Sequence, residues 1–227
     1  MPQLFAEFIQ HRVYLKGVST QTVIWYNSSF KAFDGALDSK QNVVTRIAEL
    51  KQRGLSHVSI NSHLRCINAY LNWLHTEHGE PLLKIPRLKE QQKVLATFSA
   101  EQIGRIVKGK PSGRNETRVR MIALTAIDTG MRIQELLNLR RPDVDFVNSI
   151  LKVNGKGNIQ RLVPMSLELR KVMFRHLSQH PFERVFATSG GTEPTKRNLH
   201  RDFKLLCGRL GIKDVRCSFH VSDHLKT

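Results

Sequence analysis

The hydrophobic periodicity of this chain breaks between residues 79 and 97, and the break limits what the 227 residues can form. Before it, apolar residues from Ile60 to Leu74 recur at steps of four, three, four and three, which places them on one helical face. Pro81, Pro86 and a charged run then disfavour a helix and a packed core. The sequence therefore predicts a helical domain of residues 1–82, a linker of residues 83–97 and a second domain of residues 98–227.

Positive charge is concentrated after this break. Residues 1–82 hold 8 Lys and Arg against 6 Asp and Glu, whereas residues 83–227 hold 28 against 13. So positive a field favours a polyanion, because each phosphate that is neutralised releases counterions. Nucleic acid is the leading candidate for the partner. Two alternatives remain: the lysines are merely solvated and bind no partner, or the protein binds a membrane surface. Guanidinium forks that suit phosphate oxygens recur at Arg114, Arg118, Arg120, Arg132, Arg140, Arg141 and Arg161.

Cysteine usage and hydropathy indicate a cytoplasmic protein. Cys66, Cys207 and Cys217 are odd in number and lack the spacing of metal or redox pairs, so neither a zinc site nor a disulfide framework is supported. The N-terminus has no basic-then-apolar signal pattern, and no apolar run approaches the roughly 18 residues that span a bilayer. We expect neither export nor membrane insertion, and no metal.

Local patterns in both parts predict a mainly α fold with a small antiparallel β-sheet. Ser99 and Gln102 have capping-box spacing at the start of a helix. The turn residues 154–158 join two strands as a hairpin and place Lys156 at its tip. Strands are expected over 150–153 and 160–164, and helices over 3–15, after Ser19, and over 59–74, 117–128, 132–139, 167–179 and 199–210.

The segment Thr129–Leu137 combines a Thr-Gly turn, a planar cation and the start of an amphipathic helix. Arg132 lies at the helix start, where free backbone amides and the helix dipole favour an anion such as phosphate. Glu135, three residues on, can hold the guanidinium in a fixed orientation. An ordinary surface pair at i, i+3 is the alternative, and these residues alone do not decide between the two.

The order of these motifs resembles the catalytic domain of the tyrosine recombinase (phage integrase) family. Thr129–Leu139 is similar to the family's first arginine box, and Asn154–Pro164 is similar to its lysine hairpin. Phe219 and His220 resemble the opening of its histidine-arginine box. The N-terminal helices and the linker resemble the family's DNA-clasping core-binding (SAM-like) domain, so the likeness covers nearly the full chain.

The resemblance implies a reaction on double-stranded DNA without metal, nucleotide or other cofactor. In the family, a tyrosine hydroxyl attacks a phosphodiester and leaves a 3′-phosphotyrosyl link during integration or site-specific recombination. By resemblance Arg132 clamps a nonbridging phosphate oxygen, Lys156 protonates the leaving 5′-oxygen, and His220 hydrogen-bonds the phosphate or assists proton transfer. Glu135 supports Arg132. A homo-oligomer or a complete recombinase on the same DNA is the implied protein partner.

Two departures from the family pattern bear on activity. The tyrosines are Tyr14, Tyr26 and Tyr70, which we expect to be core or interface aromatics, and none follows in the remaining 157 residues (227 − 70). Asp223 stands three positions after His220, where the second arginine belongs. Losing one preorganised donor costs about 2.7–4 kcal/mol of transition-state stabilisation. We therefore expect a catalytic domain truncated at its C-terminus, in a chain that binds DNA but cannot cleave it alone.

Three other functions compete with this expectation. A non-enzymatic competitor or regulator of a complete recombinase would retain DNA binding and need no nucleophile. A type IB topoisomerase shares the nicking strategy, but the integrase-like spacing argues against it. A helix-turn-helix repressor would explain the charge and leave the Arg132 box and the Lys156 hairpin unexplained.

Overall fold

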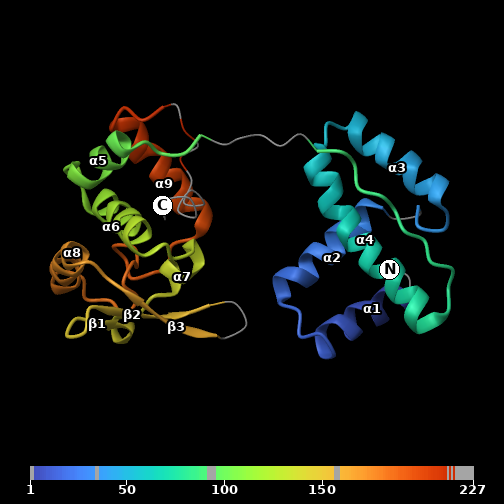
Figure 1. Cartoon of the computed structure of the whole chain (residues 1–227), viewed down its shortest axis with the longest axis horizontal. Helices are drawn as coiled ribbons and strands as arrows, with labels where there is room; N and C mark the ends of the chain where they lie inside the picture. Colours follow the sequence, from blue (N-terminus) through green and yellow to red (C-terminus); the bar gives the residue numbers. More distant parts are fainter. Residues whose placement is uncertain are drawn as a thin grey trace. The chain divides into compact units, whose positions relative to one another are not determined.

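The computed structural model describes residues 3–33, 36–90, 96–155, 159–213, 215 and 217. The chain forms two compact units, Met1–Lys93 and Val94–Thr227 (Figure 1), and each is described by itself. The predicted positions Lys156, His220 and Asp223 lie outside the described residues. None of the helices in the described ranges is long and apolar enough to cross a membrane.

The described part of the first unit is helical. Serines 19, 39 and 56 cap its second, third and fourth helices, because each hydroxyl accepts the backbone N–H three residues on. Gly79 ends the fourth helix at φ +70°, a left-handed conformation that favours glycine. The helices are α1 (Gln3–Tyr14), α2 (Thr20–Ala32), α3 (Lys40–Gln52) and α4 (His57–His78).

An aromatic cluster joins α1, α2 and α4. Phe5 stacks on Phe30 with ring centroids 3.8 Å apart, and the edge of Phe8 meets Tyr70 at 5.4 Å. Tyr26 and Tyr70 are buried, as the sequence predicts. Tyr14 is 81% exposed, which excludes a core position and leaves only the interface role that the sequence also allows for it.

The segment after α4 packs on the first unit. Ile85 is 3% exposed and belongs to the apolar core formed with α3 and α4. Asn68 donates to the Ile85 carbonyl at 2.9 Å and accepts the Ile85 N–H at 2.8 Å. Asn61 pairs with Leu88 in the same way, at 2.8 Å in both directions. The interpretation that residues 83–97 cannot pack a core was therefore wrong for the first part of that stretch, because two side-chain amides supply the partners of its backbone.

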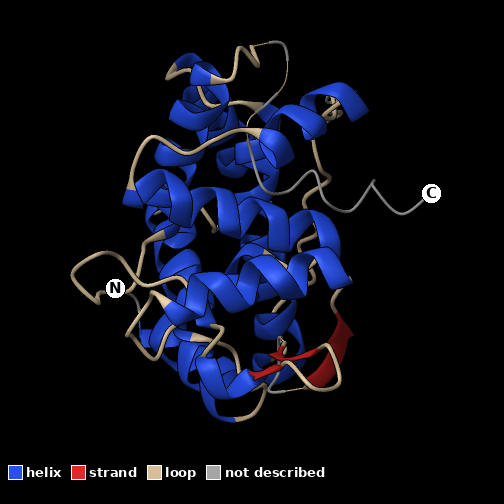
Figure 2. Cartoon of the chain, turned by 90° about the vertical axis from the view of Figure 1, so that its left-hand side faces the viewer, coloured by secondary structure: helices blue, strands red, loops and turns tan. Residues whose placement is uncertain are grey.

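The second unit combines helices with one small sheet (Figure 2). The sheet has the order β1-β2-β3 and is antiparallel throughout, which agrees with the predicted fold class. The two-residue strand β1 was not predicted, because so short a segment has no periodicity to detect. The described elements are α5 (Ala100–Lys108), α6 (Arg114–Thr129), α7 (Ile133–Asn138), the 3-10 turn η1 (Arg141–Asp143), β1 (Val144–Asp145), β2 (Ile150–Asn154), β3 (Gln160–Pro164), α8 (Leu167–Ser178) and α9 (Lys196–Arg209).

Alternation along the hairpin determines which face of the sheet is buried. Leu151, Val153 and Val163 are almost fully buried, whereas Lys152 and Leu162, which pair across β2 and β3, face outward. The capping box predicted at Ser99 and Gln102 is present at the start of α5. Helix α6 packs against α5, α8 and α9 and lies between α5 and α8 in Figure 1. The core of this unit therefore forms around α6.

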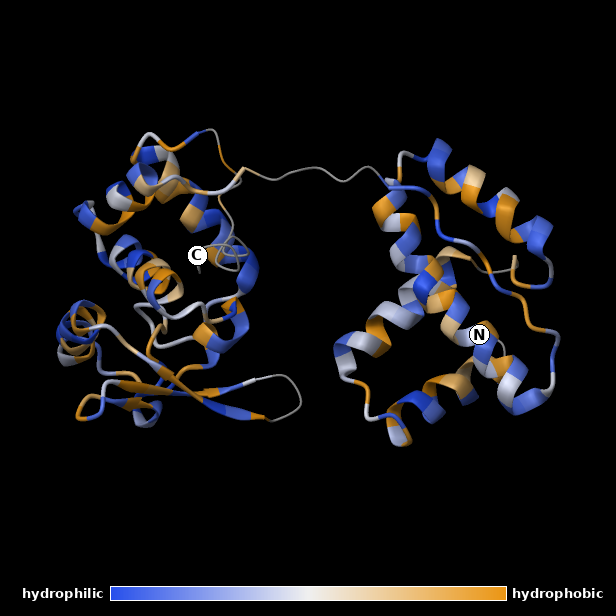
Figure 3. Ribbon diagram, viewed as in Figure 1, coloured by the Kyte–Doolittle hydropathy of each residue, from blue (hydrophilic) through white to orange (hydrophobic). Residues whose placement is uncertain are grey.

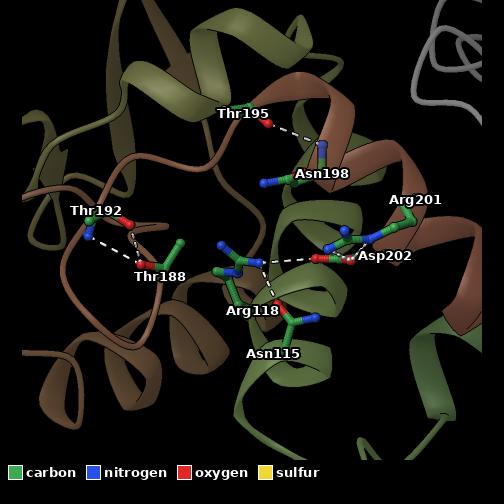
Figure 4. Close-up of polar contacts among 8 residues, drawn as sticks. All are labelled: Asn115, Arg118, Thr188, Thr192, Thr195, Asn198, Arg201 and Asp202. Carbon is green, nitrogen blue, oxygen red and sulfur yellow. Dashed lines mark hydrogen bonds and ion pairs between the residues drawn. The ribbon is translucent and has the colours of Figure 1, made fainter.

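A buried ion pair joins α6 to α9 (Figure 4). Arg118 and Asp202 are each 7% exposed, and Arg118 Nη2 donates to Asp202 Oδ2 at 3.3 Å. Arg118 also donates to Asn115, and Arg201 on the surface donates to the other Asp202 oxygen at 2.9 Å. Burial lowers the pKa of the Arg118 guanidinium, and the charge of Asp202 opposes that shift. Because breaking a buried pair is costly, this contact fixes which faces of the two helices meet.

His176 makes the stability of the second unit depend on pH. Burial lowers the pKa of its imidazole; the nearby charges of His180 and Arg141 act in the same direction, and a 2.9 Å hydrogen bond to the Val185 carbonyl opposes them. With its pKa depressed by folding, the stability due to neutral His176 is present above about pH 6.5 and lost as the pH falls below it.

We predict that the free energy of unfolding in urea is lower at about pH 5.5 than at about pH 7.5, with a smaller difference in His176→Gln. His63, whose pKa is also lowered by burial, leaves part of the pH dependence in that variant. His75→Gln, at an exposed position, is the control and retains the full difference. An equal pH dependence in the wild type and His176→Gln would contradict the assignment.

Candidate functional site

The turn between α6 and α7 positions Arg132. Gly130 ends α6 with φ +65°, which residues with a β-carbon rarely adopt, and the Thr129 hydroxyl accepts the Met131 N–H at 3.3 Å. Arg132 is then the N-cap residue of α7, in extended conformation. The sequence prediction that Gly130 divides two helices and that Arg132 stands at a helix start is confirmed.

Glu135 is the anchor of this site. The residue is 6% exposed, and its carboxylate accepts the Arg132 backbone N–H at 2.8 Å and Arg132 Nη1 at 3.3 Å. Arg161 on β3 binds the same carboxylate as a fork: Nη1 donates to Oε1 at 2.8 Å and Nη2 to Oε2 at 2.7 Å. Such bidentate pairs fix both distance and plane. One buried carboxylate therefore orients two arginines that lie 29 residues apart in the sequence (161 − 132).

The charges at this site favour an anion on its solvent side. Hydrogen bonds from Arg161 lower the pKa of Glu135, with further lowering by the Arg132 amide and opposition from burial. The same bonds raise the pKa of Arg161. Two cations thus share one carboxylate, which leaves a net positive charge. The Arg132 side chain is 75% exposed and that of Arg161 is 39% exposed, so both reach solvent while their anchor does not.

The helix terminus contributes less than the sequence suggests. Helix α7 has only six residues, and Glu135 already occupies the N–H of its N-cap residue. Its dipole and its free amides are therefore a weak anion site, because the dipole grows with the number of aligned peptides. The guanidinium groups supply the attraction instead.

The β-hairpin approaches the same carboxylate through Gly155. A β-carbon at this position would lie 3.2 Å from the Ile159 carbonyl oxygen, 3.4 Å from Arg161 Nη1 and 3.7 Å from Glu135 Oε1. The Gly155 N–H donates to that carbonyl at 2.8 Å. A side chain here would make the neighbouring backbone shift by a few tenths of an ångström, so glycine suits this close packing. The residue that precedes Lys156 thus lies beside Glu135. Lys156 itself and His220 are outside the described residues.

The pairing of Arg161 with Glu135 could not be found in the sequence. Arg161 belongs to the arginines expected to suit phosphate, but nothing in its spacing links it to a carboxylate on another element. The outward-inward alternation of β3 and the register that pairs Arg161 with Val153 bring it there. Among the described residues, no three His, Cys, Asp or Glu side chains gather as metal ligands would.

The second unit matches a known protein family. Residues 95–224 match the phage integrase family. The chain is also 26% identical over 238 residues to the tyrosine recombinase XerD of Lacticaseibacillus casei, which covers 95% of this chain and 80% of that protein. It is 24% identical over 185 residues to the tyrosine recombinase XerA of Pyrococcus furiosus. The chain therefore belongs to the phage integrase family of tyrosine recombinases.

Coverage of these relatives is uneven. The match to the Pyrococcus furiosus XerA spans 78% of this chain but 62% of that protein, and the match to the XerA of Thermococcus onnurineus spans 53% of that protein. The activity of a whole relative is therefore not carried over by the match alone.

Solved integrase structures share the fold. The integrase of transposon Tn1549, in complex with transposon right end DNA, superimposes with a TM-score of 0.77 at 17% identity, over 98% of this chain and 84% of that chain. A lambda integrase dimer bound to a core site gives a TM-score of 0.75 at 15% identity, over 98% of this chain and 86% of that chain. The expected fold class, helical with the small antiparallel sheet of the recombinase catalytic domain, is confirmed.

We predict that Glu135→Gln destabilises the protein by about 1–3 kcal/mol, because a buried neutral amide cannot satisfy two guanidinium groups and one N–H. Glu101→Gln is the matched control. Glu101 binds Arg105 at 2.7 Å but its side chain is 76% exposed, so its loss costs no more than about 0.5 kcal/mol. Urea unfolding of both variants measures the difference, and equal losses would show that Glu135 is not an anchor.

Proposed function

We propose that this chain binds double-stranded DNA in site-specific recombination or DNA integration, with Arg132, Lys156 and His220 around one backbone phosphate. The observation that carries the proposal is the exposed Arg132 held by buried Glu135, within the segment that resembles the family's first arginine box. A fixed cation binds a phosphate without reorganising, which is the requirement of a preorganised electrostatic site.

Each residue has a distinct role in this proposal. Arg132 binds a nonbridging oxygen of the phosphate. Arg161 neutralises the negative charge of Glu135, so that this carboxylate does not repel the phosphate. Lys156, the residue after Gly155, protonates the leaving 5′-oxygen. His220 hydrogen-bonds the phosphate or assists proton transfer. The transition state of phosphoryl transfer spreads charge over the phosphoryl oxygens, so positioned cations and a proton donor lower its free energy.

The two units divide the work of DNA binding. We assign residues 1–82 to a helical clasp of the core-binding type, residues 83–97 to the connection and residues 98–227 to the catalytic fold. The fold shared with integrases solved on DNA supports this assignment. A lambda integrase tetramer has been solved on a Holliday junction, which supports a multimer or a complete recombinase as partner on DNA.

The chain on its own does not cleave DNA in this proposal. The mechanism needs a tyrosine hydroxyl near the phosphate, and no tyrosine follows Tyr70 in the printed sequence. Tyr26 and Tyr70 are buried in the aromatic cluster of the first unit, so neither hydroxyl is available as a nucleophile. Tyr14 is exposed, but it ends α1 of the first unit and does not belong to the unit that carries Arg132. If Asp223 occupies the place of the family's second arginine, it would in addition repel a phosphate charge about 4 Å away by roughly 4 kcal/mol at an effective dielectric near 20. A non-enzymatic competitor or regulator of a complete recombinase is the second candidate.

We predict that the chain binds a fluorescent DNA duplex of about 30 base pairs with an affinity that falls steeply with salt, and that Arg132→Gln reduces the log–log slope by about one. Fluorescence anisotropy over a KCl series measures both quantities. Arg105→Gln is the matched control, because Arg105 is also exposed and is likewise paired with a glutamate, Glu101, at 2.7 Å, but it is not among the arginines expected to contact phosphate. Equal effects of the two substitutions would argue against a phosphate site at Arg132.

We further predict that the chain forms no covalent adduct with a nicked suicide duplex carrying its cognate site, selected from a random-sequence pool. A denaturing gel reports the adduct, and a complete recombinase on its own site is the positive control. A single reproducible adduct would refute the inactivity. Inhibition of a complete recombinase on shared DNA by added chain would instead favour the regulatory function.

A further inference from the structure

The outer face of α8 borders a hollow that no DNA-binding role explains. The hollow has a volume of about 470 Å³, and we call it the α8 groove. It is lined by Phe146, Leu167, Arg170, Lys171, Phe174 and Arg175. Phe146 follows β1, so the groove lies at the turn between β1 and β2. The Glu135 anchor contacts the hairpin near Gly155, beyond the other end of β2.

The floor of the α8 groove is apolar and exposed. Leu167 and Phe174 are 60% and 59% exposed, although both are large apolar side chains on a helix. Phe146 meets Phe174 edge to face, with ring centroids 5.4 Å apart. Val147, next in sequence to Phe146, is 86% exposed. Apolar side chains that are exposed together beside one hollow, rather than scattered singly, point to a binding surface. Figure 3 shows hydrophobic and hydrophilic residues alternating along α8.

Three cations surround this floor. Arg170, Lys171 and Arg175 form no ion pair within the described part of the chain. The one acidic residue of α8 is Glu168, in its first turn. The groove thus presents an apolar strip with a net positive border. From Leu167 to Phe174 the strip runs about 11 Å along the helix, which is two turns.

These properties identify the chemistry of the occupant. A DNA backbone would neutralise the three cations but would leave Phe174 and Leu167 in water, since stacking on aromatic rings requires unpaired bases. A second copy of the chain carries a net charge of +17 and is repelled by the same border. An amphipathic helix with Leu or Phe on one side and Asp or Glu beside them matches both parts of the surface. We propose that the α8 groove binds such an acidic amphipathic helix of a partner protein.

The test uses the full chain and a synthetic fluorescent peptide of about 16 residues, with Leu and Phe at helical i, i+3, i+4 and i+7 positions and Glu between them. A scrambled peptide of equal composition is the control. We expect the patterned peptide to bind at least about tenfold more tightly than the scrambled one, and binding to weaken as KCl is raised. The scrambled peptide binding equally well, or neither peptide binding, would overturn the proposal.

Substitutions locate the binding surface. Phe174→Ser and Lys171→Glu should each weaken peptide binding by about tenfold or more. Leu205→Ser and Lys204→Glu on α9 are matched controls, since Leu205 is 66% exposed and Lys204 is also exposed, and they should leave peptide binding unchanged. Circular dichroism verifies that all four variants are folded. Equal losses in the controls would overturn the proposal, as would a loss of duplex DNA binding in Phe174→Ser with the peptide unaffected. The test does not depend on Arg132, so its failure and the failure of the DNA proposal are distinguishable.

Discussion

The hydrogen bonds of the buried Glu135 carboxylate are the interaction on which the second unit depends. The carboxylate joins the turn after α6 to strand β3 and so connects the two segments that resemble family motifs. A buried carboxylate without partners would be strongly unfavourable, and a pair of arginines without it would repel one another. The carboxylate therefore keeps the two arginines close together, and the arginines compensate the burial of the carboxylate. The exposed guanidinium of Arg132 is a consequence of this arrangement, because its anchor is in the interior while its own charge stays in solvent.

A second carboxylate repeats the arrangement in the same unit. Asp202 on α9 is about as deeply buried as Glu135, and its carboxylate also forms an ion pair with an exposed arginine, Arg201. Its inner partner is Arg118 on α6, the helix that leads to Gly130 and Arg132. Helix α6 thus carries a buried ion pair in its first half and leads at its C-terminal end to the turn that Glu135 holds. The cost of removing these charged groups from water offsets most of their attraction, so the two sets of ion pairs add little net stability. They do restrict how α6, α9 and the hairpin can pack.

Much of the fold follows from local signals, and the exceptions have physical causes. The four-and-three spacing from Ile60 to Leu74, the cap at Ser99 and the alternation along β2 and β3 act over a few residues, and each appears as the sequence predicts. Residues 83–88 have the sequence pattern of a linker, because the side-chain amides that bind them lie far away in the sequence, on α4. Asn61 and Asn68 lie seven residues apart on one face of α4. No hydrophobic pattern predicts that these two side chains will bind the backbone of an extended segment.

The candidate site divides in the same way. Gly130, Arg132 and Glu135 lie within six residues, so their turn, cap and ion pair can be anticipated from spacing. The fork from Arg161 cannot, because it depends on the hairpin folding back onto α7 across 26 residues. Gly155 is likewise explained by contact, since a β-carbon there would lie only 3.2 Å from the Ile159 carbonyl oxygen across the hairpin. Sequence therefore locates the cation that faces solvent, whereas tertiary structure is needed to find what holds it.

Binding and cleavage of DNA have separable physical requirements in such a site. The cations proposed to bind a phosphate are oriented by Glu135 and β3, which belong to the folded core, so the fold preserves them whether or not a nucleophile is present. A tyrosine hydroxyl contributes only in the transition state and stabilises neither the core nor the bound phosphate. A chain that lacks it can therefore keep its stability and its affinity for DNA while losing only the chemical step. This asymmetry makes a recombinase fold suited to a non-cleaving DNA-binding role, because the groups that bind are also groups that the fold requires.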